Sequence, residues 1–136
     1  MKFNEVEAST WLEMRRYFDT CLLPVTAMSG GESPAEATAE LERLRDLMDK
    51  IELPFKGRTV TYPALHYCEK DESAFLNTLC RRFKASGYRY VVLLTARAAV
   101  RLQAGEADLI IAASEDELPS DLEVRQAVQA MWQAGA

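Results

Sequence analysis

Apolar residues recur near the start of the chain at the spacing of a helix. The apolar positions are Trp11, Met14, Phe18, Cys21 and Leu22. Thr10 and Glu13 have the spacing of a capping box, in which two side chains bind free backbone N–H groups at a helix start. Pro24 sets the outer limit of the helix. The pattern therefore predicts a first helix that ends before Pro24, with Asp19 and Thr20 as its polar terminus and turn.

A longer amphipathic pattern follows a connector rich in glycine. Ser33, Pro34 and Glu36 combine a serine cap, a proline at the first helical position and a capping glutamate. The apolar positions beyond them, at spacings of four and three, are Ala37, Leu41, Leu44, Met48 and Ile51. Pro54 ends this second helix, whose apolar face we expect to contact the core.

The rest of the chain alternates between strand and helix patterns. We expect strands at 58–63, 88–95 and 107–113, and the last two should be buried on both faces because their apolar runs are near-continuous. Helices are expected after Asp71, over 96–104 and after Ser120, and Phe3–Val6 suits a short edge strand. Such alternation implies parallel pairing with right-handed crossovers. The sequence predicts one three-layer α/β domain over residues 1–136, with a mainly parallel sheet of about four strands and Tyr88–Thr95 central.

Composition narrows the class of protein. The net charge of -5 and the pI near 5.0 argue against a nucleic-acid partner, because proteins that bind nucleic acids usually carry a stripe of basic residues. The basic pairs Arg15–Arg16 and Arg81–Arg82 fit solvated helix faces. No apolar run is long enough to span a membrane, and the first residues lack the pattern of a signal peptide. The three cysteines form no disulfide framework, so we expect a cytoplasmic protein with reduced thiols.

Candidate chemistry is sparse, and it is expected beyond the carboxyl ends of the parallel strands. That rim would hold residues 63–66, 95–97 and 114–117. His66 is the only histidine, and no Ser or Cys motif provides it with a catalytic partner. Thr95 and Arg97 could bind an anion at a helix start, although no glycine-rich phosphate loop is present. No cluster has the spacing of metal ligands, so no metal, cofactor or catalytic residue is predicted.

Cys21 is the one residue whose place beside Asp19 raises the question of a nucleophile. A neighbouring negative charge raises the pKa of a thiol and weakens it as a nucleophile. Its spacing also places Cys21 on the apolar face of the predicted helix. We therefore interpret Cys21 as a buried packing residue.

Two segments, YFDTCLLPV (17–25) and LPFKGRTVTYP (53–63), resemble the YpiF-like family of bacteria such as the bacilli, whose function is unknown. The matching positions are Asp19, Thr20, Leu23, Pro24, Phe55, Lys56, Gly57 and Arg58. Cys21 departs from the family pattern. By gene neighbourhood, the resemblance implies a link to the menaquinol–cytochrome c reductase of the respiratory chain. This permits an accessory role at the cytoplasmic side of that complex.

Two functions remain open from the sequence. The first is a non-catalytic accessory domain that acts through a protein partner. The alternative is a domain or enzyme that binds a small anionic molecule at the rim, with Asp19, Arg58, His66 and Arg97 as its polar groups. Either way, we expect the Asp19 carboxylate to lie within about 4 Å of Lys56 or Arg58.

Overall fold

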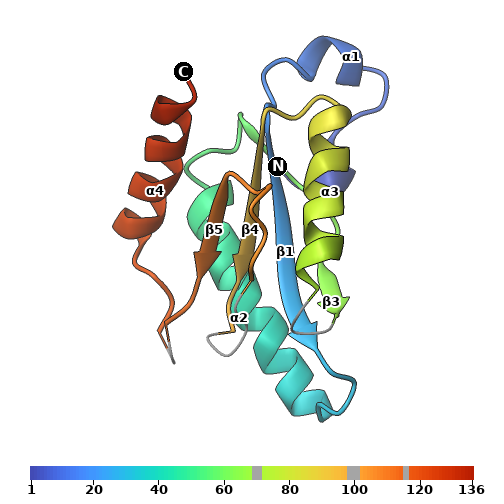
Figure 1. Cartoon of the computed structure of the whole chain (residues 1–136), viewed down its shortest axis with the longest axis vertical. Helices are drawn as coiled ribbons and strands as arrows, with labels where there is room; N and C mark the ends of the chain where they lie inside the picture. The colour runs from blue at the N-terminus through green and yellow to red at the C-terminus, as the bar shows by residue number, and fades with distance from the viewer. Residues whose placement is uncertain (69–71, 98–101, 115–116) are drawn as a thin grey trace.

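The computed structural model describes residues 1–68, 72–97, 102–114 and 117–136. Its sheet has five strands in the order β2–β1–β4–β5, with β3 also paired to β1. The strands are β1 Thr20–Met28, β2 Thr59–Thr61, β3 Leu65–Tyr67, β4 Tyr90–Thr95 and β5 Leu109–Ala112. All four pairings are parallel, so every strand begins at one side of the sheet, here called the amino edge, and ends at the opposite, carboxyl edge (Figure 1).

Helices cover both faces of the sheet, which confirms the predicted α/β fold (Figure 1). They are the 3-10 turn η1 Phe3–Glu5 and the helices α1 Trp11–Met14, α2 Pro34–Glu52, α3 Ser73–Ala85 and α4 Asp121–Ala134. Cys21 and Leu23 point to the face covered by α3, while Leu22 packs with α2 and α4 on the other. α1 and the end of α4 both lie at the amino edge (Figure 1).

The predicted first helix is the main error of the sequence analysis. Only Trp11–Met14 is helical, and Thr20–Met28 forms the nine-residue strand β1 next to β4. All nine residues of β1 are buried. A strand buried on both faces is a continuous apolar run, which helical periodicity also fits. Asp19 and Thr20 are therefore the entrance of a central strand, and they do not form the end of a helix.

Pro24 lies inside β1, where a proline usually disrupts a ladder. The Tyr62 N–H donates to the Leu22 oxygen at 3.0 Å, so the backbone groups of even-numbered β1 residues face β2. On that side β2 ends at Thr61 and β3 begins at Leu65. The N–H that Pro24 lacks would have faced the gap between two short strands, which explains why the sheet accepts it.

Smaller expectations also fail for local reasons. Phe3–Val6 is no strand, because the Glu5 carboxylate accepts from the Lys2 N–H and closes η1. Thr10 caps nothing, since its hydroxyl donates to the Glu7 oxygen. The strand predicted at 107–113 is β5 at the sheet's edge, and it is only partly buried. Of the predicted helix at 96–104, residues 98–101 lie outside the described residues, and 96–97 and 102–104 are not helical.

The remaining helices follow their sequence signals. Ser33 and Glu36 form the predicted capping box of α2, and Ser120 caps α4 by accepting from the Glu123 N–H. Leu44 and Ile51 are buried in the core as expected, whereas Leu41 keeps 42% of its surface exposed. No helix in the described part of the chain combines the length and the apolar character that a membrane crossing requires.

Candidate functional site

The predicted site residues do not form one site. Asp19, Thr20, Lys56 and Arg58 lie at the amino edge, where β1 and β2 begin. His66, Thr95 and Arg97 lie towards the carboxyl edge, within β3 or at the end of β4. Parallel strands hold these two sets at opposite ends of the sheet. Asp19 and Arg58 are therefore too far from His66 and Arg97 to line one ligand site, and that expectation is wrong.

At the amino edge, the expected ion pair forms between Asp19 and Arg58. Arg58 Nε lies 2.9 Å from Asp19 Oδ1, and Nη2 lies 3.0 Å from Oδ2, so both carboxylate oxygens are bound. Asp19 keeps 25% and Arg58 40% of the side-chain surface exposed. The pair links the entrances of β1 and β2, since the Thr20 N–H also donates to the Arg58 oxygen at 3.3 Å. The neighbouring Lys56 is exposed and does not take part.

Trp132 of α4 completes this network, and the sequence analysis did not assign it a polar role. Its Nε1 donates to the buried Thr20 hydroxyl at 2.8 Å, and that hydroxyl donates to Asp19 Oδ1 at 3.0 Å. The Arg58 guanidinium stacks 4.0 Å from the centre of the Trp132 ring. Each side chain of the network therefore binds at least one other, so the network is suited to holding α4, β1 and β2 together.

Three further arginines lie at the amino edge: Arg15, Arg16 and Arg89. All three are exposed, and no ion pair joins them to a carboxylate among the residues that the structure describes. Arg15 donates to the Ser86 oxygen at 2.8 Å, and Arg89 donates to the Gly135 oxygen. Arg16 donates to the Tyr17 hydroxyl at 2.8 Å. These neutral acceptors orient the three guanidinium groups without neutralising their charge, so the arginines remain able to bind an acidic group from outside.

At the carboxyl edge, His66 is bound to β1. Its Nδ1 lies 3.3 Å from the Thr26 hydroxyl, and its backbone oxygen accepts from the same hydroxyl at 2.8 Å. Thr26 is buried, and no described Ser or Cys forms a nucleophile pair with the ring. These contacts attach β3 to β1.

The carboxyl ends of β1 and β4 are the point where the strand order reverses, and ligands of such sheets usually bind there. Here Arg97 occupies the position: Nη1 donates to the Ala27 oxygen at 3.0 Å, and Nε lies 3.6 Å from Glu40 of α2. The Arg97 N–H donates to the Thr95 hydroxyl at 3.3 Å. Guanidinium and backbone donor are therefore both engaged within the protein, which weakens the predicted anion site.

Comparison with known families places the chain in one of them. The sequence profile of DUF2487, a family described as a protein of unknown function, matches residues 9–119. The chain belongs to the DUF2487 family. The match includes the Asp19–Arg58 pair but ends before α4 and Trp132. Searches of the curated proteins and of the solved structures return no match.

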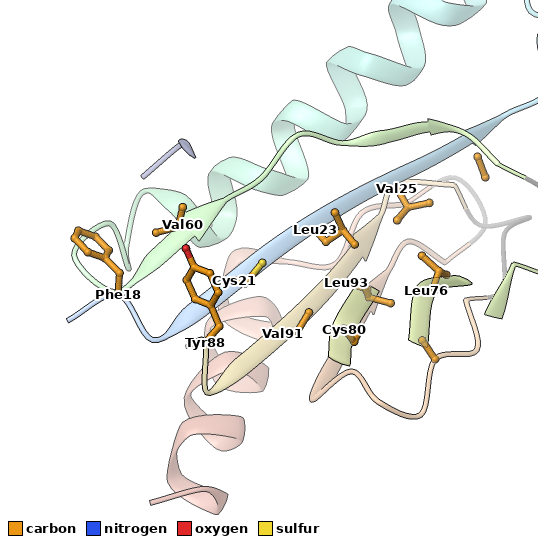
Figure 2. Close-up of a cluster of buried hydrophobic side chains, with 12 residues drawn as sticks. Phe18, Cys21, Leu23, Val25, Val60, Leu76, Cys80, Tyr88, Val91 and Leu93 are labelled. Atoms are coloured by element: carbon orange, nitrogen blue, oxygen red, sulfur yellow. The ribbon is translucent and has the colours of Figure 1, made fainter. Parts of the chain in front are cut away.

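Two observations bear on metal and thiol chemistry in this DUF2487 member. The described residues contain no group of three His, Cys, Asp or Glu side chains placed to hold a metal ion. Cys21 is fully buried in β1 beside Val91 and Leu93, in the core cluster of Figure 2. Burial raises the pKa of the Cys21 thiol, and the nearby Cys80 adds to that effect. The thiolate, which is the reactive form, is therefore disfavoured.

We expect Cys21 to react with a thiol reagent only when the DUF2487 chain unfolds. The partly exposed Cys68 serves as the control in the same sample. Labelling followed by peptide mass spectrometry should show modification at Cys68 in native protein and at Cys21 only in denaturant. Rapid native labelling of Cys21 would contradict its assignment as a packing residue.

Proposed function

We propose that this DUF2487 member is a non-catalytic binding domain whose amino edge docks on an acidic surface of a protein partner. The observation that carries the proposal is the group of exposed arginines there, Arg15, Arg16 and Arg89, without a carboxylate partner among the described residues. The chain as a whole has a net charge of -5, so three exposed arginines without a carboxylate partner in the described part of the chain stand out at this edge. Such a local field favours association with carboxylate groups.

Apolar side chains at the same edge support docking of a protein. Leu12, Met14 and Tyr17 are exposed large hydrophobic residues on α1 and the turn after it. Leu12 keeps 80% of its surface exposed, the highest fraction among the exposed large hydrophobic residues described. Apolar groups next to arginines are typical of protein interfaces, where arginine and aromatic residues are enriched.

The YpiF-like resemblance suggests a candidate for the partner. Its gene neighbourhood points to the menaquinol–cytochrome c reductase, and a cytoplasmic accessory protein would meet the exposed part of that complex. The other function considered, binding of an anionic molecule at the carboxyl edge, is less well supported, because Arg97 is already bound by Ala27 and Glu40.

Site-specific photo-crosslinking tests the proposal. A diazirine amino acid would replace Leu12 at the amino edge, or Leu122 on α4 as a matched control that is also exposed. After irradiation in cells that naturally make the protein, mass spectrometry would identify the crosslinked peptides. We expect position 12 to give one protein whose crosslinked surface is rich in Asp and Glu.

The control separates docking from random collision. A protein that crosslinks equally from positions 12 and 122 would contradict the proposal. Crosslinks from position 12 to lipid alone, or to surfaces without acidic residues, would contradict it as well. Turnover of a small molecule by the isolated protein would contradict the non-catalytic part of the proposal.

A further inference from the structure

A second feature lies on the α3 side of the sheet, beneath the N-terminal segment. There a hollow of about 370 Å³ separates that segment from the start of the sheet. Its outer wall is formed by Phe3, Val6, Ala8 and Trp11. Its inner wall is formed by Val60, Tyr62 and Tyr88. We refer to it as the N-terminal hollow. Its volume lies in the range of pockets that hold small molecules, about 300–1,000 Å³.

Three aromatic rings of the hollow, those of Trp11, Tyr62 and Tyr88, contact one another. The Tyr62 and Tyr88 rings meet edge to face at 5.6 Å between centroids, and Trp11 lies 6.4 Å from Tyr88. Phe83 of α3 supports Tyr62 from outside the hollow at 4.7 Å. A pre-formed aromatic wall favours a flat, apolar ligand, because little side-chain freedom is lost when it binds.

One polar feature of the hollow could orient a bound ligand. The hydroxyls of Tyr62 and Tyr88 lie 2.7 Å apart and form a hydrogen bond with each other. Two phenols carry two protons, and the bond between them uses one, so one O–H donor remains. No other hydrogen-bond partner for either hydroxyl occurs in the described parts of the chain. In Figure 2 the Tyr88 hydroxyl points towards Val60, which also lines the hollow.

We propose that the N-terminal hollow binds a small, flat, apolar molecule that carries an oxygen acceptor, such as a carbonyl, for the Tyr62–Tyr88 pair. Aromatic and aliphatic walls bury the body of the ligand, and the remaining phenol proton donates to its oxygen. Burial of Tyr88 in this apolar surrounding raises the pKa of its phenol, so the Tyr88 hydroxyl keeps its proton. The site goes beyond the proposed docking function, since it uses the inner side of the N-terminal segment.

A matched pair of probes tests the chemistry of the site. Benzophenone and diphenylmethane have the same two rings and differ in the carbonyl group. We expect benzophenone to shift the NMR signals of the Trp11 indole and the Val60 amide. We also expect it to bind roughly 2- to 10-fold more tightly than diphenylmethane, as one hydrogen bond would provide. The Tyr62→Phe/Tyr88→Phe variant should remove this preference, whereas each single variant keeps one phenol donor.

Location is tested by filling the hollow from outside. Ala8 is an exposed lining residue, so Ala8→Trp should block binding without disturbing the core. Ala39→Trp, at an exposed position of α2, is the control and should bind as the unmodified chain does. The proposal is overturned if benzophenone shifts neither signal up to its solubility limit. It is also overturned if Ala8→Trp binds unchanged, or if the two probes bind equally to the unmodified chain.

Discussion

Leu22→Ala and Leu23→Ala should each lower the free energy of unfolding by about 2–5 kcal/mol, the usual cost of truncating a buried leucine. The reason is the position of these neighbours in β1, where successive side chains point to opposite faces. Leu22 packs with Leu47 and Val128 beneath α2 and α4, while Leu23 packs with Leu76 of α3. Urea unfolding measures both changes.

The control for these substitutions is Leu41→Ala on the exposed part of α2. Its expected effect is below about 0.5 kcal/mol, as for an ordinary surface position. If 17–25 were the end of an amphipathic helix, Leu23 would lie outside the apolar face. A small loss of stability from Leu23→Ala together with a large loss from Leu22→Ala would therefore contradict the assignment of β1 as a strand.

The second large effect is expected at the Asp19–Arg58 pair. Asp19→Asn should cost about 1.5–3 kcal/mol, because it weakens hydrogen bonds to a charged group while leaving Arg58 stacked on Trp132. The pair is partly exposed, so the cost should lie between those of surface and buried ion pairs, about 0–1 and 3–5 kcal/mol. A double-mutant cycle with Arg58→Gln measures the coupling.

Arg45 and Asp46 on α2 offer a matched control pair. They form an ion pair at 3.1 Å with both side chains more than half exposed. Arg45→Gln and Asp46→Asn should therefore couple by less than about 1 kcal/mol. Equal coupling in the two pairs would show that Trp132 and Thr20 add nothing to the network at the amino edge.

The sequence predicted the fold class because caps and apolar patterns agree in most of the chain. α2 and α4 begin at serines that accept from the third residue of the helix, and such local signals need no tertiary context. β1 could not be distinguished from a helix, because its burial on both faces removes the alternation that marks a strand. β3, which has three residues, escaped notice beside Pro63.

From the sequence, contacts at the site could be predicted only between residues that a single strand pairing brings together. Asp19 and Arg58 were expected to approach each other, and they do so at the entrances of neighbouring strands. Their separation from His66 and Arg97 depends on the direction of β1, which the helix interpretation missed. Trp132 lies 112 positions from Thr20 in the sequence, and no local pattern relates them. The Tyr62–Tyr88 pair likewise arises from tertiary packing.

The central claim is that the arginines of the amino edge bind an acidic partner surface. The measurement is the affinity of the partner that crosslinks at position 12 for the variant Arg15→Glu/Arg16→Glu/Arg89→Glu. Its control is Arg45→Glu/Arg81→Glu/Arg125→Glu, which changes the net charge equally at exposed positions of α2, α3 and α4. We predict that affinity falls roughly 10- to 100-fold in the first variant only. An unchanged affinity, or an equal loss in both variants, would contradict the claim.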